Sequence, residues 1–263
     1  MGMLYSSFCW HYEDLMMYSF NYMQEGEGKI WYAIPAQDRT KFEKVANRKY
    51  RSIAKEDPNF LFNINSMICP DYLSKKGVTV YSTVQKPGEF ILTFPESYHA
   101  GFSVGFNVAE AVNFTCPTWV KHAEKAMRIY LKSREKVPVL PLQWIILESN
   151  LKLPIYISKI VKNELINRKE IRKEFNQKLA DPINFEQQQE TSQKDDETRF
   201  ECSYCIRLCY CSFLKCTSCQ KHYCSNHGFI CGCAVDKIKL FTRYTDEELQ
   251  QKEADARRQP AKH

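Results

Sequence analysis

The chain has 263 residues, a formal charge of +6 at pH 7, 44% hydrophobic residues and twelve cysteines. This length accommodates one large or two modest domains, and the hydrophobic fraction is sufficient for a real core. The sequence contains no run of about 18 apolar residues and no N-terminal charged and apolar regions, so neither a membrane span nor a secretory signal is expected. The net charge is too small to establish nucleic-acid binding by itself.

The N-terminal part is rich in the aromatic and bulky apolar residues that are typical of β-strands. Strands are predicted at residues 3–11, 15–23 and 29–34. His11 and Glu13 stand where the first strand ends, separated by one residue. Since residues i and i+2 of a strand point to the same face, this pair aims an imidazole and a carboxylate at one point. Taken alone, such a pair is more often a buried histidine beside a solvated glutamate.

A helical insert separates these strands from a second group. Helices are predicted at residues 36–51, 59–67 and 71–76, and strands at 78–84, 90–94 and 107–114. The strand 90–94 leads to His99, a second imidazole. Two histidines and one carboxylate form the facial triad of non-haem Fe(II) oxygenases, which leaves positions open for cosubstrate and dioxygen. Ala111 and Asn113 share one face of the last strand, where small side chains either leave room for a ligand or simply pack. Gly101 and Gly105 allow close backbone approach near the metal, or ordinary turns.

Beyond residue 117 the apolar residues recur at helical spacing. Pro138 and Pro141 break the first helical run, and a second amphipathic helix is predicted at residues 155–179. Its many charges are interpreted as a solvated face, with nucleic-acid contact as the less favoured alternative. Residues 181–199 are polar and without periodicity, which predicts a linker or flexible loop. After the cysteine-rich part, residues 237–249 predict a strand and the start of a helix capped by Thr245, with a frayed polar end from residue 250 onward.

Nine of the twelve cysteines lie between Cys202 and Cys233. In a secreted chain that density suggests disulfides, and in an intracellular one it suggests metal. Eight residues stand in closely spaced pairs: Cys202, Cys205, Cys216, Cys219, Cys224, His227, Cys231 and Cys233. Short hairpins that each give two ligands to one tetrahedral ion are a strong zinc signal, and eight ligands predict two closed, structural sites. Cys209 and Cys211 are left over, and His222 is interpreted as a surface residue rather than a ligand.

Four stretches together resemble the JmjC domain of histone lysine demethylases, over about residues 3–119. They are Ser6–Asp14, Tyr18–Tyr22, Lys29–Pro35 and Tyr98–Phe114. The order of five Cys, one His and two Cys resembles the zinc finger that follows this domain in the JARID-type branch. The resemblance implies an α+β fold, with a double-stranded β-helix (a jelly-roll, cupin-like barrel) followed by a helical region and a small two-zinc module. Four segments are expected: the barrel at 1–117, the helical region and linker at 118–198, the zinc finger at 199–245 and a polar tail at 246–263.

The resemblance also implies the site residues. The Fe(II) ligands would be His11, Glu13 and His99, and the 2-oxoglutarate pocket would be lined by Phe8, Ser19, Asn21, Lys29 and Trp31. Lys29 suits this role because a dicarboxylate needs a cation at the end that the metal does not hold; its spacing alone favours a solvated lysine. The zinc ligands would interleave, with Cys202, Cys205, Cys224 and His227 on one ion and Cys216, Cys219, Cys231 and Cys233 on the other.

The implied function is oxidative demethylation of methylated lysine in histone H3, at the lysine-4 position, in the nucleus. The implied partner is the histone H3 tail or the nucleosome, and a chromatin complex or a DNA contact would be compatible with it. Because Met1 precedes His11 by only ten residues, the barrel is expected to be incomplete at its N-terminus. Two alternatives stay open: a non-catalytic chromatin adaptor with the same fold, and a JmjC hydroxylase of protein side chains.

Overall fold

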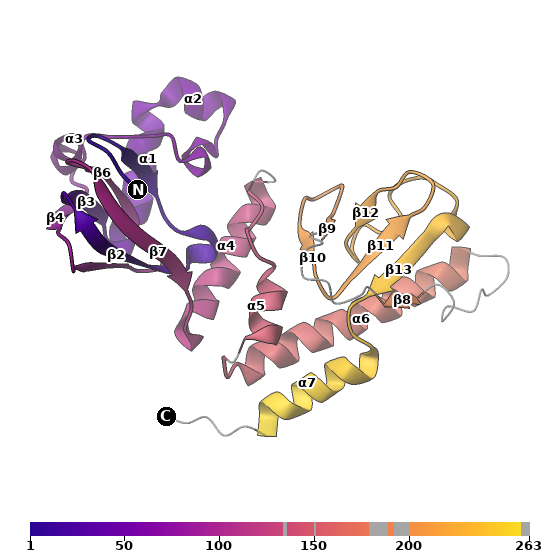
Figure 1. Ribbon diagram of the computed structural model, residues 1–263. Coiled ribbons are helices and arrows are strands. Elements are labelled where there is room, and N and C mark those ends of the chain that lie inside the picture. Colours follow the sequence, from indigo (N-terminus) through magenta and orange to yellow (C-terminus); the bar gives the residue numbers. More distant parts are fainter. Residues whose placement is uncertain (134–135, 150, 179–188, 192–199, 259–263) are drawn as a thin grey trace. The chain divides into compact units, whose positions relative to one another are not determined.

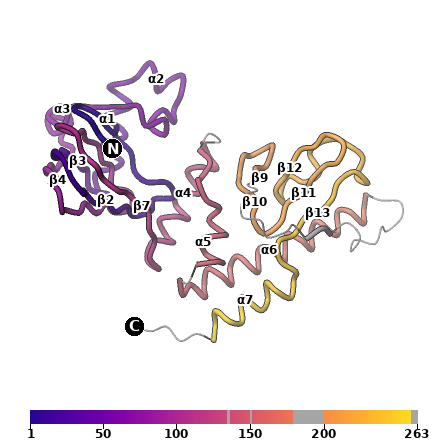
Figure 2. Tube along the Cα trace, viewed as in Figure 1, coloured from indigo at the N-terminus to yellow at the C-terminus, as the bar shows by residue number. Residues whose placement is uncertain are grey.

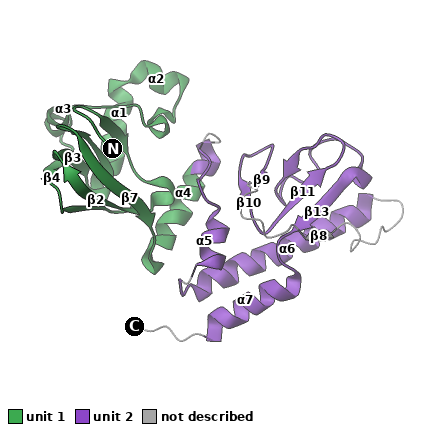
Figure 3. Cartoon of the chain, in the orientation of Figure 1, with its two compact units in different colours: residues 1–129 green, residues 130–263 purple. Residues whose placement is uncertain are grey.

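The computed structural model describes residues 1–133, 136–149, 151–178, 189–191 and 200–258. The chain divides into two compact units, residues 1–129 and 130–263 (Figure 3). This division falls within helix α4 (Val120–Ser133), and the finer division at residues 118, 199 and 246 stays a prediction. Among the described residues, no helix has both the length and the apolar composition that crossing a membrane requires.

The first unit is built on two antiparallel sheets (Figure 1). The four-stranded sheet has the order β1 (Ser7–His11), β6 (Tyr98–Ser103), β3 (Lys29–Ile34) and β4 (Tyr81–Gln85). The three-stranded sheet has the order β5 (Phe90–Thr93), β2 (Tyr18–Gly26) and β7 (Asn107–Phe114). Strands that are remote in sequence therefore become neighbours, above all β1 and β6.

Most of the predicted strands are present, with corrections to their limits. The first begins only at Ser7, and the second begins at Tyr18 because residues 14–16 form a 3-10 turn in which Leu15 and Met16 have φ near +50°. The strand β6, which carries His99, was not predicted as a strand. The helix predicted at 59–67 was wrong, since that stretch holds only a 3-10 turn, Phe60–Asn63.

Helices α1 (Arg39–Lys49), α2 (Arg51–Glu56) and α3 (Pro70–Lys75) make up the insert. A core cluster joins Phe42 and Leu73 of these helices to Trp10, Tyr98 and Ala100 of the four-stranded sheet. Because side chains alternate along a strand, the neighbouring residues of those strands point to the other face of the sheet. The insert therefore packs on one face and leaves the other face for the site.

The three-stranded sheet shows the same alternation in β2. Ser19 and Asn21 line a cavity on the inner side. On the other side, the ring of Phe20 stacks on Phe90 at a centroid distance of 4.6 Å, and Phe90 is 54% exposed. Exposed apolar surface of this kind is typical of faces that bind something else.

The second unit combines helices with a small sheet. The helices are α5 (Leu142–Glu148), α6 (Pro154–Lys178) and α7 (Asp246–Arg258). The sheet has the order β12 (His222–Tyr223), β11 (Ser212–Cys216), β13 (Ile238–Thr242) and β8 (Gln189–Thr191), and β9 (Phe200–Glu201) pairs with β10 (Leu208–Cys209). The β8 strand falls within the predicted linker, whose other residues up to 199 lie outside the described residues.

Helix α7 runs beside α6 (Figures 1 and 2). Arg168 of α6 is fully buried, and its guanidinium donates to the carbonyl of Tyr244 at 2.9 Å and to Asp246 at 2.8 Å. The predicted Thr245 cap is confirmed, because its hydroxyl accepts the N–H of Glu248 at 3.1 Å. The predicted frayed end from residue 250 was wrong: the docked helix continues to residue 258.

Candidate functional site

The pairing of β1 with β6 brings the two predicted histidine ligands together, since His11 and His99 are directly opposite in the register. Glu13 lies just beyond the end of β1, in extended backbone with φ −66° and ψ 154°. The ligand atoms of all three residues lie within 4.8 Å of one another. Nε2 of His99 is 3.3 Å from Oε1 of Glu13, and the two imidazole centroids are 4.3 Å apart.

Backbone carbonyls orient both imidazoles. Nδ1 of His11 donates to the carbonyl of Cys9 at 2.7 Å, and Nδ1 of His99 donates to the carbonyl of Ser97 at 3.2 Å. Because a carbonyl can only accept, Nδ1 carries the hydrogen in each ring and Nε2 is left for the site. Such contacts behind the ligands are usual at metal centres, where they set the tautomer and the ring orientation.

Glu13 is ionised in this environment. Burial raises the pKa of its carboxyl, but hydrogen bonds from the side chains of His99, Asn113 and Ser19, together with the charge on His99, lower it to about 2. The group is therefore a carboxylate at neutral pH, as a metal ligand must be.

All eight residues predicted for iron and 2-oxoglutarate line one cavity of about 300 Å³: Phe8, His11, Glu13, Ser19, Asn21, Lys29, Trp31 and His99. They come from both sheets, so the cavity lies between them. Ala111 and Asn113 of β7 line it too, which favours the interpretation that their side chains leave room for a ligand.

One wall of the cavity is aromatic. The rings of Phe8 and Trp31 pack at a centroid distance of 4.6 Å, and Nζ of Lys29 lies 5.9 Å from the Phe8 centroid. Burial lowers the pKa of Lys29. Among the described residues, no carboxylate forms an ion pair with Lys29, which therefore offers a partly buried cation to a ligand.

A polar layer behind the cavity was missed from the sequence. Gln85 is fully buried; its Oε1 accepts the indole N–H of Trp31 at 2.9 Å, and its Nε2 donates to the carbonyl of Asn21 at 3.1 Å. The hydroxyls of Ser19 and Thr93 are 2.5 Å apart. No pattern in a single sequence distinguishes Gln85 or Thr93 from ordinary strand residues.

Gly101 serves close approach rather than a turn. It lies within β6, and a Cβ atom there would come 2.1 Å from the carbonyl oxygen of Ile30 and 2.5 Å from the Phe8 ring. Gly101 thus makes the space in which Phe8 forms the cavity wall. A Cβ at Gly105 would instead meet the side chain of Glu27.

These features fit a cation and a dicarboxylate. Two imidazoles and a carboxylate converge at one point of the cavity, while Lys29 stands on β3 with no counter-charge from the part of the chain that the structure describes. Asn21 also lines the cavity, and its buried Oδ1 has no hydrogen-bond partner among the described residues; turning the amide over would aim Nδ2 at a carboxylate in the same place. The donor set matches that of non-haem iron, and the spare cation matches a second carboxylate.

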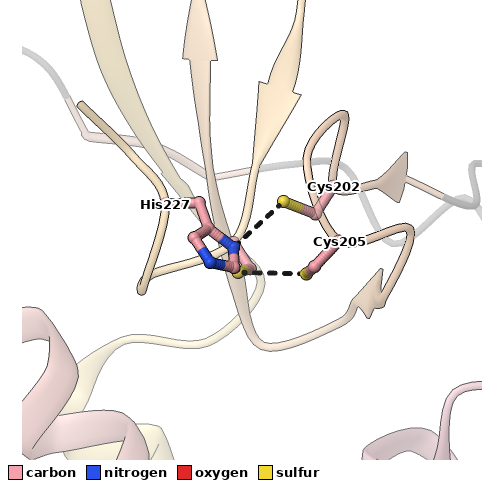
Figure 4. Close-up of side chains that lie close together, drawn as sticks. Cys202, Cys205 and His227 are labelled. Atoms are coloured by element: carbon pink, nitrogen blue, oxygen red, sulfur yellow. Dashed lines mark hydrogen bonds between the residues drawn. The ribbon is translucent and has the colours of Figure 1, made fainter. Parts of the chain in front are cut away.

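In the second unit, the cysteine-rich segment forms two clusters. Cys202, Cys205 and His227 of the first cluster are drawn in Figure 4. The ligand atoms of Cys202, Cys205, Cys224 and His227 lie within 4.8 Å of one another, as do those of Cys216, Cys219, Cys231 and Cys233. These are the two interleaved sets that were predicted. A tetrahedral zinc with bonds of about 2.3 Å separates two sulfurs by about 3.8 Å, and Sγ of Cys205 is 3.8 Å from Sγ of Cys224.

Cys209, Cys211 and His222, which the sequence did not assign to zinc, lie outside both clusters. Burial raises the pKa of Cys209 to about 12 and raises that of Cys211 as well, so both are neutral thiols within the core. His222 belongs to neither cluster, and the prediction of a surface position was wrong, because this residue is half-buried. Its ring packs against the stacked rings of Phe200 and Phe213, at centroid distances of 4.8 and 5.5 Å.

Residues 1–114 match the family model of the JmjC domain, hydroxylase, and residues 202–252 match that of the C5HC2 zinc finger. The chain therefore carries a JmjC domain, with its cupin-like α+β fold, joined to a C5HC2 zinc finger. It is homologous to plant lysine-specific demethylases, which confirms the resemblance seen in the motifs.

Three of these relatives illustrate the similarity. The chain is 31% identical to lysine-specific demethylase JMJ17 of Arabidopsis thaliana over 95% of its own length and 33% identical to JMJ703 of Oryza sativa subsp. japonica over 94%. It is 41% identical to the putative lysine-specific demethylase JMJ16 of Arabidopsis thaliana over 52% of its length. The chain spans only 21%, 22% and 11% of these relatives, respectively.

Proposed function

We propose that this chain provides the oxygenase site of a histone lysine demethylase that uses Fe(II) and 2-oxoglutarate. The observation that carries the proposal is the cavity in which the three converging ligand side chains lie together with the ammonium of Lys29, which pairs with no carboxylate of the described residues. The names of the relatives support lysine demethylation. The zinc finger supports a lysine-4 substrate on histone H3 only through its likeness to the JARID-type branch. A nuclear location and a histone H3 partner follow from that substrate.

His11, Glu13 and His99 would hold the iron from one side, through two Nε2 atoms and one carboxylate oxygen. When bound, iron and 2-oxoglutarate supply the oxidising chemistry that removes an N-methyl group as formaldehyde. Lys29 would neutralise the far carboxylate of the cosubstrate, and Asn21 and Ser19 would hydrogen-bond it. Phe8 and Trp31 exclude water from that end of the cavity.

The structural zinc ions would be held by the two cysteine-rich clusters. Each cluster supplies four ligands, which leaves no open position for substrate, as is usual for zinc that serves folding. The finger would then be a rigid accessory module rather than a second reaction centre.

The test is release of formaldehyde and succinate from a peptide of the histone H3 tail methylated at lysine 4, with Fe(II), 2-oxoglutarate and dioxygen. We expect release by the natural chain and none by His11→Ala. His122→Ala is the matched control, because His122 pairs with Glu96 outside the cavity. Equal release by His11→Ala would contradict the proposal.

The same experiment separates the two alternatives. A chromatin adaptor would release neither product with any methylated peptide. A hydroxylase would release succinate without formaldehyde, and its peptide product would gain mass where demethylation removes it.

A further inference from the structure

The second unit holds a cavity of about 550 Å³ that belongs to neither metal cluster. Helix α5 contributes Trp144 to its lining, and α7 contributes Glu248 and Asp255. The phenol rings of Tyr210 and Tyr244 also line it. The cavity thus combines aromatic rings with carboxylates, which is the composition that binds ammonium groups.

The aromatic part is held in place by hydrogen bonds. The hydroxyls of Tyr210 and Tyr244 are 2.8 Å apart, and the hydroxyl of Tyr244 donates to the carboxylate of Glu148. Burial and the contact with Glu148 raise the pKa of Tyr244, so it stays a neutral phenol. Two of the rings therefore form a preorganised wall.

The chain's own cations already show what this wall attracts. Cζ of Arg243 lies 4.6 Å from the Tyr210 centroid, and Nζ of Lys252 lies 4.9 Å from the Tyr244 centroid. Lys252 is also paired with Glu148 at 2.9 Å. Nε of Arg243 is buried, so that guanidinium is part of the wall. No cation from the described part of the chain lies over Trp144.

Two further carboxylates of α7 line the cavity, on either side of Lys252, whose ammonium pairs with Glu148. Glu248 and Asp255 stand seven residues apart, on one face of α7, and both are exposed. Neither forms an ion pair with any described residue. Glu248 accepts the N–H of Thr245 and Asp255 accepts from Gln251, contacts that fix their positions without neutralising them.

A neighbouring cavity of about 370 Å³ shares Lys252 and Asp255 with the first. Its lining is otherwise mixed: Leu151, Leu153 and Ile157 are among its aliphatic residues, and Ser149 and Lys152 are polar. Because the two cavities share residues of α7, we treat them as one groove with an aromatic, charged end and an end that offers aliphatic side chains. That sequence of surfaces suits an extended peptide better than a small molecule.

We propose that this groove binds a peptide segment in which a lysine is followed by aliphatic residues. The lysine ammonium would lie against Trp144 and pair with one of the two carboxylates, Glu248 or Asp255, while the other adds to the negative potential of the groove. The aliphatic neighbours would occupy the cavity lined by Leu153 and Ile157. This site lies in the second unit, and its binding of a basic segment does not depend on the oxygenase chemistry.

The test uses the full, zinc-loaded chain without iron or 2-oxoglutarate, so that no demethylation takes place. The probe is a synthetic peptide with one lysine next to aliphatic residues and with both ends blocked, and its binding is measured by fluorescence anisotropy. We expect it to bind, and the same peptide with glutamine in place of lysine to bind about tenfold more weakly. This comparison needs no protein variant.

Variants locate the binding. We expect Trp144→Ala to weaken binding about tenfold. The double variant Glu248→Gln, Asp255→Asn should weaken it about fivefold, an effect that salt diminishes. Trp144→Phe should retain most of the affinity, and Glu247→Gln is the control, because Glu247 has the same charge on α7 but does not line the groove.

Four results would overturn the proposal: no binding of the lysine peptide, equal binding of the glutamine peptide, preference for an acidic peptide, or unchanged binding by both groove variants. None of these results would bear on the proposed demethylase activity, which is measured separately. Conversely, a chain that lacks demethylase activity would still bind the peptide if the groove acts as proposed.

Discussion

Lys29 provides the sharpest test of the oxygenase cavity, because its ammonium is half-buried and has no ion-pair partner among the described residues. The substitution Lys29→Met removes the charge and keeps a side chain of similar length. Loss of one partner from a buried charge pair costs about 2–5 kcal/mol. Because Lys29 is only partly buried, we take the lower part of that range, which corresponds to a rise of about 30- to 150-fold in the Kd for 2-oxoglutarate.

The same residue predicts a pH dependence. Burial lowers the pKa of Lys29, so its charged form is lost at a lower pH than for an exposed lysine. The affinity for 2-oxoglutarate should be complete below that pKa and should fall as the pH rises through it. Lys29→Arg keeps its charge throughout this range and should remove the alkaline loss.

The assay is titration calorimetry of 2-oxoglutarate into the anaerobic chain with Mn²⁺ in place of Fe²⁺. Lys86→Met is the control, since Lys86 is exposed in the turn before β5. If Lys29→Met bound 2-oxoglutarate within twofold of the natural chain, Lys29 would not anchor the cosubstrate and our reading of the cavity would be refuted.

Three further predictions concern the scaffold. Glu96 is buried and accepts a hydrogen bond from Arg39 at 2.8 Å, and contacts with its basic neighbours outweigh burial and lower its pKa. Glu96→Gln should reduce the free energy of unfolding at pH 7 by about 2–3 kcal/mol. In the natural chain this stabilisation is present above the unfolded-state pKa of Glu96 and is lost as the pH falls from there through the lower folded-state pKa. In urea denaturation, the free energy of unfolding of the variant should therefore fall less steeply with decreasing pH. Gly101→Ala should lower the free energy of unfolding by at least about 2 kcal/mol through overpacking against Phe8, and this should appear as a lower Tm. An unchanged Tm would mean that the strand has room to relax. A chelator should remove two zinc ions per chain, as counted by elemental analysis, and should make the finger susceptible to limited proteolysis. A finger that stayed resistant to the protease after chelation would not depend on metal.

The sequence alone determined which residues could bind metal, because ligand chemistry and short spacing are local properties. The pairs Cys202 with Cys205 and Cys216 with Cys219 are recognisable as hairpin ligands without any fold. The one-residue spacing of His11 and Glu13 likewise predicted that these two side chains share a face, since the period of two is a property of the strand itself.

Only the tertiary structure decided which of these local features meet. His99 reaches His11 because β6 pairs with β1 across 88 positions of sequence, a register that no local pattern specifies. The orphan oxygen of Asn21, the buried amide of Gln85 and the space left by Gly101 depend on what the opposing strand brings. The helix from Asp246 to Arg258 extends beyond its predicted end, because docking on α6 supplies contacts that its own polar sequence lacks.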